Sequence, residues 1–287
     1  MSFCEAGRYT VCVIGGMNMD VLGRGDSLFR MRDSNIGTIV FRPGGVGRNI
    51  AEKLARAGIS TELFTVIGND PTAVLLEQSC AELGIGLSFS LHVQEKSPVY
   101  MAIHDETGDM LTAVNDMSAM KYLTGEAVKE KAPYINRCGV CILDANLSEE
   151  ALLAAARYTE VPILLDPVSC EKAKRCMGIL DRVTAIKPNL IEAESMTGAE
   201  NEKEAAERLL QKGVKNVYIS LGKKGVYYAC DKSRGYITPE KVYTGIQTGA
   251  GDAMCAGIAE AMTRSQGTEE CARSGMRFSA RLLEGKY

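Results

Sequence analysis

Short runs of apolar, often β-branched residues alternate with helical patterns along most of the chain. The run Val11–Ile14 ends at two glycines, and residues 46–57 then repeat apolar side chains at helical spacing before Gly58. Strands that are separated by helices are typical of parallel sheets. The pattern predicts an α/β fold with a doubly wound, mostly parallel central sheet flanked by helices. Further strands are expected at 62–68, 140–145, 162–167, 183–189 and 216–222, and helices at 72–83, 148–158 and 202–212.

Two segments break this alternation. Residues 21–41 and 98–116 have the pattern of extended chain, and the second segment contains a hairpin turn at Glu106–Asp109. With no repeat and no Pro- or Ser-rich linker, the pattern predicts a single domain over residues 1–287. The expected insertion is a small β lid formed by about residues 18–43 and 96–118. Because exposed strand edges pair readily with another chain, we expect a homodimer that forms through the lid.

The charge balance restricts the kinds of partner. The chain has 33 Lys and Arg against 36 Asp and Glu, a net charge of −3, and no block of five like charges. This balance gives no electrostatic reason to bind nucleic acid or an anionic membrane. No apolar run approaches the length of a membrane helix, and the first residues lack the pattern of an export signal. The sequence therefore predicts a cytoplasmic protein that acts on a small molecule.

The most informative motif is Thr248-Gly249-Ala250-Gly251-Asp252, which precedes a helical pattern. Small residues at a helix start let an anion approach the free backbone N–H groups and the positive end of the helix dipole. Asp252 has the chemistry to accept a proton from a hydroxyl group while the turn holds a transferring phosphoryl group. The alternative is that Asp252 only offsets the helix dipole.

Two further glycine clusters lie in the first fifty residues. Gly44 and Gly45 lead into the first helical pattern, where their bare backbone would let sugar hydroxyls approach and Asn49 would bind them. Asn18 and Asp20 follow the first strand and could bind a diol by donating and accepting hydrogen bonds. A turn with a helix start explains the first cluster equally well, and an Asx turn explains the second.

Motifs of other phosphate-binding and hydrolytic classes are missing from the sequence. It contains no GxxxxGK[ST] loop and no GxSxG elbow, and neither early glycine cluster completes GxGxxG. The sequence therefore argues against a P-loop enzyme, an α/β-hydrolase and a nicotinamide-dependent oxidoreductase.

The glycine motifs, in this order and spacing, resemble the signatures of the ribokinase-like (PfkB) family of carbohydrate and nucleoside kinases. GGVGRNIA at 44–51 resembles the N-terminal signature of the family, and TGAGDAMCAG at 248–257 resembles the C-terminal one. The likeness runs from about residue 11 to residue 278. It implies a ribokinase-like fold, ATP and Mg²⁺ as the phosphoryl donor and metal, and a nucleoside or sugar as the acceptor.

The resemblance also implies a role for each matching residue. Asp252 would be the catalytic base, beside an anion hole of Gly249, Ala250 and Gly251. Asn189 and Glu192 match an Asn-x-x-Glu motif that organises Mg²⁺ and phosphates through water, with Glu192 as the metal residue. Taken alone, Glu192 has the pattern of a solvated helix face. The positions implied for the sugar are Asn18, Asp20, Gly44, Gly45 and Asn49, and those for ATP are Asn189, Ser220, Gly222, Gly225 and Thr248.

The lid stretch at 102–117 resembles the pseudouridine kinase branch of the family more than ribokinase. In that branch Asn115 and Asp116 would lie near the bound nucleoside and read a uracil edge. The leading hypothesis is therefore phosphorylation of the 5′-hydroxyl of pseudouridine. The alternatives are ribose, another nucleoside or a sugar phosphate as acceptor, the last because five arginines occur between residues 24 and 48, and a binding protein without catalysis.

Two departures from the family pattern underlie the non-catalytic alternative. Ile246 stands where relatives usually have a polar residue associated with a monovalent cation, which argues against potassium activation. The sequence ends at Tyr287, whereas relatives usually continue further around the adenine. Two interpretations follow: the adenine contacts are incomplete, or the chain is shortened.

Overall fold

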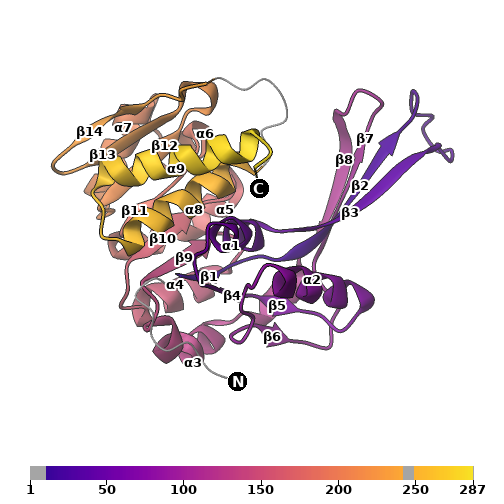
Figure 1. The fold of residues 1–287 in the computed structure, drawn as a ribbon, viewed down its shortest axis with the longest axis horizontal. Coiled ribbons are helices and arrows are strands. Elements are labelled where there is room, and N and C mark those ends of the chain that lie inside the picture. Colours follow the sequence, from indigo (N-terminus) through magenta and orange to yellow (C-terminus); the bar gives the residue numbers. More distant parts are fainter. Residues whose placement is uncertain (1–10, 242–248, 287) are drawn as a thin grey trace.

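The computed structural model describes residues 11–241 and 249–286, and its largest element is an eight-stranded sheet (Figure 1). The strand order is β14-β13-β12-β11-β10-β9-β1-β4, with parallel pairing from β4 to β12 and antiparallel pairing from β12 to β14. The predicted mostly parallel α/β sheet is confirmed. Its strands are β1 Val11–Ile14, β4 Thr61–Phe64, β9 Val140–Asp144, β10 Ile163–Asp166, β11 Ala185–Ile186, β12 Asn216–Ser220, β13 Val226–Cys230 and β14 Arg234–Ile237.

Helices cover both faces of this sheet, as alternation along β1 shows. Val11 and Val13 pack into the core on one face, and Cys12 and Ile14 pack into the core on the other. Because both faces are buried, the strands consist of continuous apolar runs. The first core contains α1 Val46–Arg56, α2 Pro71–Glu82, α8 Ala250–Thr263 and α9 Thr268–Leu283. The second contains α3 Gly125–Ile135, α4 Glu149–Tyr158, α6 Leu190–Thr197 and α7 Glu202–Gln211, near the short helices η1 Ser118–Tyr122, α5 Cys170–Ala173 and η2 Lys174–Arg182.

The single strand expected at 62–68 is wrong, because the chain changes sheets at Thr65. The Thr65 N–H donates to the Ser90 hydroxyl at 3.2 Å instead of continuing the pairing with β1. β4 ends at Phe64, and β5 Val66–Ile67 pairs with β6 Leu91–His92 in a separate two-stranded sheet. Threonine is common within strands, so Thr65 in the run at 62–68 gives no sign of such a transfer.

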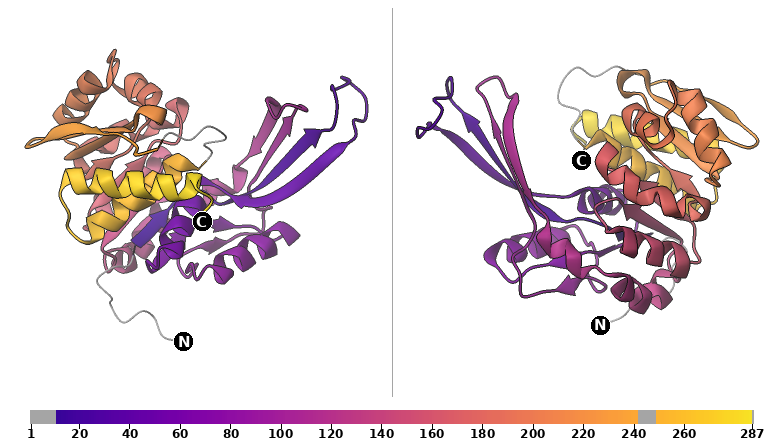
Figure 2. Two further views of the ribbon diagram at one scale, coloured as in Figure 1. Left: turned by 45° about the horizontal axis from the view of Figure 1, so that its top comes forward. Right: turned by 180° about the vertical axis from the view of Figure 1, so that it is seen from behind.

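A four-stranded sheet projects away from the body of the molecule (Figures 1 and 2). Its order is β3-β2-β7-β8, formed by β3 Gly37–Gly44, β2 Asn18–Gly25, β7 Val99–His104 and β8 Met110–Asp116. The turn between β7 and β8 is fixed by Asp105, whose carboxylate accepts from the N–H groups of Thr107 and Asp109, each at 2.9 Å. The extended segments and the hairpin therefore occur where the sequence predicts them.

Helix α8 is the most enclosed helix of the body. Its residues from Ala253 to Ala261 are all buried, because α9 and α1 pack against it beside the sheet (Figure 1). A Cβ on Gly257 would lie 2.5 Å from the carbonyl oxygen of Ser274, so the close approach of the two helices requires glycine there. This packing fixes the start of α8 beside the sheet. In the part of the chain that the structure describes, no helix has the length and apolarity needed to cross a membrane.

Candidate active site

Charged side chains gather where the parallel strands end, which is where open α/β sheets bind ligands. Asp144 is the last residue of β9, Asp166 is the last residue of β10, and Lys187 follows β11 directly. A cavity of about 970 Å³ opens at this edge and is lined by Asp166, Lys187 and Asp252. The cavity is large enough for a nucleotide.

The N-terminal turn of α8 lines the cavity, and its first residues have little or no side chain. Gly249 precedes the helix with φ 84°, a left-handed conformation that favours glycine, and no described side chain caps this end. A Cβ added to Gly251 would meet only the Lys187 Nζ, at 3.5 Å. The predicted residues Gly249, Ala250 and Gly251 thus form an open helix start. Such a start stabilises an anion through its free N–H groups and its dipole.

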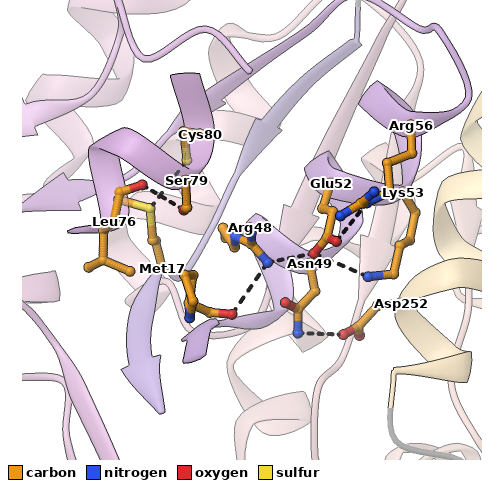
Figure 3. Close-up of polar contacts among 11 residues, drawn as sticks. Met17, Arg48, Asn49, Glu52, Lys53, Arg56, Leu76, Ser79, Cys80 and Asp252 are labelled. Carbon is orange, nitrogen blue, oxygen red and sulfur yellow. Dashed lines mark hydrogen bonds and ion pairs between the residues drawn. The ribbon is translucent and has the colours of Figure 1, made fainter. Parts of the chain in front are cut away.

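The carboxylate of Asp252 lies in the first turn of the same helix. It accepts a hydrogen bond from the Asn49 amide at 3.0 Å, across a sequence separation of 203 residues (Figure 3). Burial, followed by the negative charge of Asp166, raises the pKa of Asp252 to about 7, against the opposing effects of Asn49 and Lys187. A carboxyl group with a pKa near neutrality has the property that a general base needs.

Lys187 and Asp166 form an ion pair at 3.2 Å, with side chains 5% and 6% exposed. Burial opposes the charge of Lys187, but the Asp166 carboxylate outweighs it and holds the pKa of Lys187 above its usual range. Lys187 is therefore a permanent cation beside the start of α8. No motif in the sequence points to either residue. The only signals are their positions, Asp166 at the end of a predicted strand and Lys187 near the end of another.

Asn189 and Glu192 line the cavity and together form a capping box at the N-terminus of α6. The Asn189 N–H donates to the Glu192 carboxylate at 2.9 Å, and the Glu192 N–H donates to the Asn189 side chain at 2.8 Å. Glu192 is buried, contrary to the solvated helix face that its pattern suggests, and burial raises its pKa. Among the described residues, no group of three Asp, Glu, His or Cys side chains could hold a metal ion. Magnesium commonly binds through one or two carboxylates, waters and substrate phosphates, and Glu192 is a carboxylate that lines the cavity.

The remaining residues predicted for ATP are divided between the cavity and a segment that is not described. Ser220, Gly222 and Gly225 line the cavity, at the end of β12 and around the short helix η3 Gly222–Lys224. Thr248 and Ile246 lie outside the described residues.

The residues predicted for the sugar form a second group beside Asp252. The Asn18 amide donates to the Asp20 carboxylate at 2.6 Å, and a Cβ on Gly44 would lie 2.3 Å from that carboxylate. Gly45 has φ 96°, and a Cβ there would lie 2.5 Å from the carbonyl oxygen of Gly16. Burial raises the pKa of Asp20. Because α1 begins directly after Gly45 and carries Asn49, this group is connected to Asp252 by one hydrogen bond.

The register of the four-stranded sheet separates Asn115 from Asp116. Asn115 pairs with Tyr100, which pairs with Asp20, so the three side chains share one face of the sheet. Asp116 is the next residue along β8 and therefore belongs to the other face. Its carboxylate accepts the Ser118 N–H at 3.1 Å, which holds the start of η1. The geometry brings Asn115, but not Asp116, to the face of Asp20.

Comparison with known proteins identifies the family. The model of the pfkB family of carbohydrate kinases matches residues 9–285. The chain is 34% identical to pseudouridine kinase from Escherichia coli, over 96% of this chain and 91% of that protein. It is 23% identical to guanosine-inosine kinase from Exiguobacterium acetylicum, over 95% of this chain and 94% of that protein.

Solved structures have the same fold. A ribokinase from Thermotoga maritima superposes with a TM-score of 0.87 at 24% identity, over 96% of this chain and 93% of that one. Arabidopsis thaliana ribokinase, solved with ribose and ATP, superposes with a TM-score of 0.80 at 20% identity, with the same coverage of 96% and 93%. The family match and the curated relatives together mean that the chain belongs to the pfkB family of carbohydrate kinases and is a phosphotransferase that acts on a hydroxyl group.

Proposed function

We propose that this protein transfers the γ-phosphoryl group of ATP to the 5′-hydroxyl of pseudouridine, with Asp252 as the general base. The observation that carries the proposal is the pairing of a partly buried carboxylate with an open helix start. Asp252 has a pKa near neutrality and lies one residue after Gly251, where free N–H groups face the cavity. An acceptor hydroxyl held by the Asn18 group would therefore meet a base and a phosphate site together.

In the proposed reaction, the Asp252 carboxylate accepts the proton of the 5′-hydroxyl as its oxygen bonds to the γ-phosphorus and the bond to ADP breaks. The N–H groups at the start of α8 stabilise the negative charge on the transferring phosphoryl oxygens, and the Lys187 ammonium lies within reach of the same position. Magnesium, bound with the nucleotide, supplies further charge neutralisation. Asn49 keeps the Asp252 carboxylate oriented through the 3.0 Å hydrogen bond.

The four-stranded sheet is proposed to act as the lid of a single kinase domain. It carries Asp20 and Asn115 on one face and joins the body at Gly44 and Asp116, which are the ends of β3 and β8. Closure over the acceptor would exclude water and so prevent ATP hydrolysis.

The choice of pseudouridine rests on the relative from E. coli, which is 34% identical over nearly the whole chain, and on the carboxylate and amides of Asn18, Asp20 and Asn115. One observation favours a second candidate acceptor, a phosphorylated sugar. Arg42 pairs directly with Asp20 across β2 and β3, so its guanidinium belongs to the same face of the sheet.

A panel of acceptors tests the proposal. Purified protein with ATP and Mg²⁺ is given pseudouridine, uridine, cytidine, guanosine, ribose and ribose 5-phosphate, and ADP release gives kcat/KM for each. We expect pseudouridine to have the highest kcat/KM by about tenfold or more, because a site built for polar groups rejects analogues that leave them unpaired. A preference for ribose 5-phosphate would support the second candidate. Tight binding of pseudouridine without ADP release would support a non-catalytic binding protein.

We also propose that the protein forms a homodimer through the four-stranded sheet. The face opposite Asp20 exposes a row of apolar side chains, Phe41 and Val114 among them, at 62% and 68% exposure. A contiguous apolar face of this kind is typical of an interaction site. Substitution Phe41→Glu is expected to convert a dimer to a monomer in analytical ultracentrifugation, and Val40→Glu, on the opposite face, is the matched control. A monomeric wild type at micromolar concentration would contradict the proposal.

A further inference from the structure

Helix α1 carries a second polar side chain toward the site, one turn after Asn49. Lys53 follows Asn49 by four residues and therefore lies on the same face of the helix, and its side chain is only 9% exposed (Figure 3). α1 packs directly against α8, which carries Asp252. The buried ammonium group thus lies in the contact between the two helices, beside the Asn49–Asp252 hydrogen bond.

The Lys53 ammonium shares its counterion, the Glu52 carboxylate, with two arginines. Its Nζ lies 3.2 Å from the Glu52 carboxylate, but Glu52 also binds Arg48 Nη1 at 2.5 Å and Arg56 Nε at 2.8 Å. Three cations therefore share one carboxylate, and the group keeps a net positive charge. The side chains of Lys53, Arg48 and Glu52 are nearly buried, at 9%, 8% and 13% exposure, so solvent screens this charge less than it would at the surface.

Burial raises the pKa of Asp252 most, and four neighbouring side chains then modify its charge state. Asp166 at the end of β10 opposes ionisation, and Lys187 after β11 favours it. From α1, Asn49 favours ionisation through its hydrogen bond and Lys53 through its charge, which lowers the pKa of Asp252. Lys187 is already engaged with Asp166 at 3.2 Å. Lys53 is not paired with Asp166 and can therefore offset the effect of the Asp166 charge on Asp252.

We propose that Lys53 is a positioning residue whose charge, from the α1 side of the site, favours the ionised form of the catalytic base. The inference rests on the proposed role of Asp252 and extends it to a residue that touches neither ATP nor the acceptor. An opposite charge close to a carboxylate stabilises its ionised form, and Figure 3 shows Lys53 and Asp252 on the same side of α1. Asn49 holds the direction of the Asp252 carboxylate, and Lys53 supplies the charge.

The test is the pH dependence of kcat/KM for Lys53→Met. In the wild type, kcat/KM is expected to fall below about pH 7 as Asp252 becomes protonated. In Lys53→Met this acid limb should move up by about one pH unit. The variant would then be about tenfold slower than wild type at pH 6 and nearly equal to it at pH 9. Lys53→Arg keeps the charge and should keep the wild-type profile. Arg56→Met, which removes a more exposed cation from the same Glu52, is the matched control.

A variant that should shift the acid limb in the opposite direction distinguishes an electrostatic effect from structural damage. Glu52→Gln removes the negative charge next to Lys53, so its acid limb should move to lower pH, a change that loss of packing cannot produce. Profiles for Lys53→Met and Glu52→Gln that superpose on the wild type, or that fall by the same factor at every pH, would overturn the role of Lys53. An acid limb that persists in Asp252→Asn would instead contradict the base assignment itself, which separates the two failures.

Discussion

Asp252→Asn is expected to lower kcat by about 10²- to 10⁴-fold, the usual effect of losing a general base. The amide has the shape of the carboxylate and can still accept the Asn49 hydrogen bond, but it cannot accept a proton from the acceptor hydroxyl. The loss should therefore appear in kcat and leave the KM for ATP within about threefold of wild type. Steady-state ADP release with the preferred acceptor measures both. Turnover within tenfold of wild type would remove Asp252 from the role of base.

The same substitution should stabilise the folded protein at alkaline pH. The pKa of Asp252 is about 7 in the folded protein against 3.8 in an unperturbed carboxyl group, so the folded state binds this proton more tightly than the unfolded state does. Ionisation of Asp252 therefore lowers stability progressively as the pH rises from about 4 to about 7. Asp252→Asn cannot ionise, so its melting temperature should exceed that of wild type at pH 8, and the difference should vanish near pH 4. A variant that is less stable at pH 8 would show that the ionised carboxylate is well accommodated.

The second large effect is expected for Gly251→Ala. The added methyl group finds space in the protein itself, since its only near neighbour is the flexible end of Lys187 at 3.5 Å. It would, however, occupy the surface that an incoming phosphoryl group must approach. Turnover should fall by about 10²-fold or more, which is comparable to losing one oxyanion donor. Stability should stay equal or rise by up to about 1 kcal/mol, because alanine favours the helix more than glycine does.

Two other glycines provide controls for this substitution. Gly249→Ala places a side chain at φ 84° and should cost about 1 to 2 kcal/mol of stability. Gly267 is the N-cap of α9, with φ −68° and no atom near its added Cβ, so Gly267→Ala should leave activity unchanged and lower stability by no more than about 1 kcal/mol. Urea unfolding and ADP release separate the three cases. Full activity in Gly251→Ala would mean that no phosphate binds against this turn.

The fold followed largely from local patterns, because buried strands and amphipathic helices leave regular signals in the sequence. No bounds were predicted for helices α3, α6 and α9, and two further exceptions depend on pairing between distant segments. The run at 62–68 does not indicate the break at Thr65. The break depends on the hydrogen bond from the Thr65 N–H to the hydroxyl of Ser90, which is distant in the sequence. The antiparallel edge formed by β13 and β14 was not predicted, because its residues do not follow the strand-helix alternation that identified the other strands.

The candidate site was predictable where a motif is continuous and not where it is assembled by the fold. Gly249, Gly251 and Asp252 stand together in the sequence, and their grouping in space follows from that. The Asp166–Lys187 ion pair and the position of Lys53 depend on which strand ends and helix faces meet, which no local pattern specifies. Asn115 and Asp116 were predicted as a pair, whereas the alternation of β8 assigns them to opposite faces.

The most direct measurement follows the phosphoryl group itself. Wild-type protein is incubated with pseudouridine, Mg²⁺ and ATP that carries ¹⁸O in its γ-phosphoryl group, and the labelled phosphate of the product is located by phosphorus–proton correlation in NMR spectra. We expect one labelled phosphate on the 5′-oxygen of pseudouridine for each ADP formed, and no such product with Asp252→Asn over the same time. ADP that accumulates with labelled inorganic phosphate, or label transferred equally well by Asp252→Asn, would contradict the account.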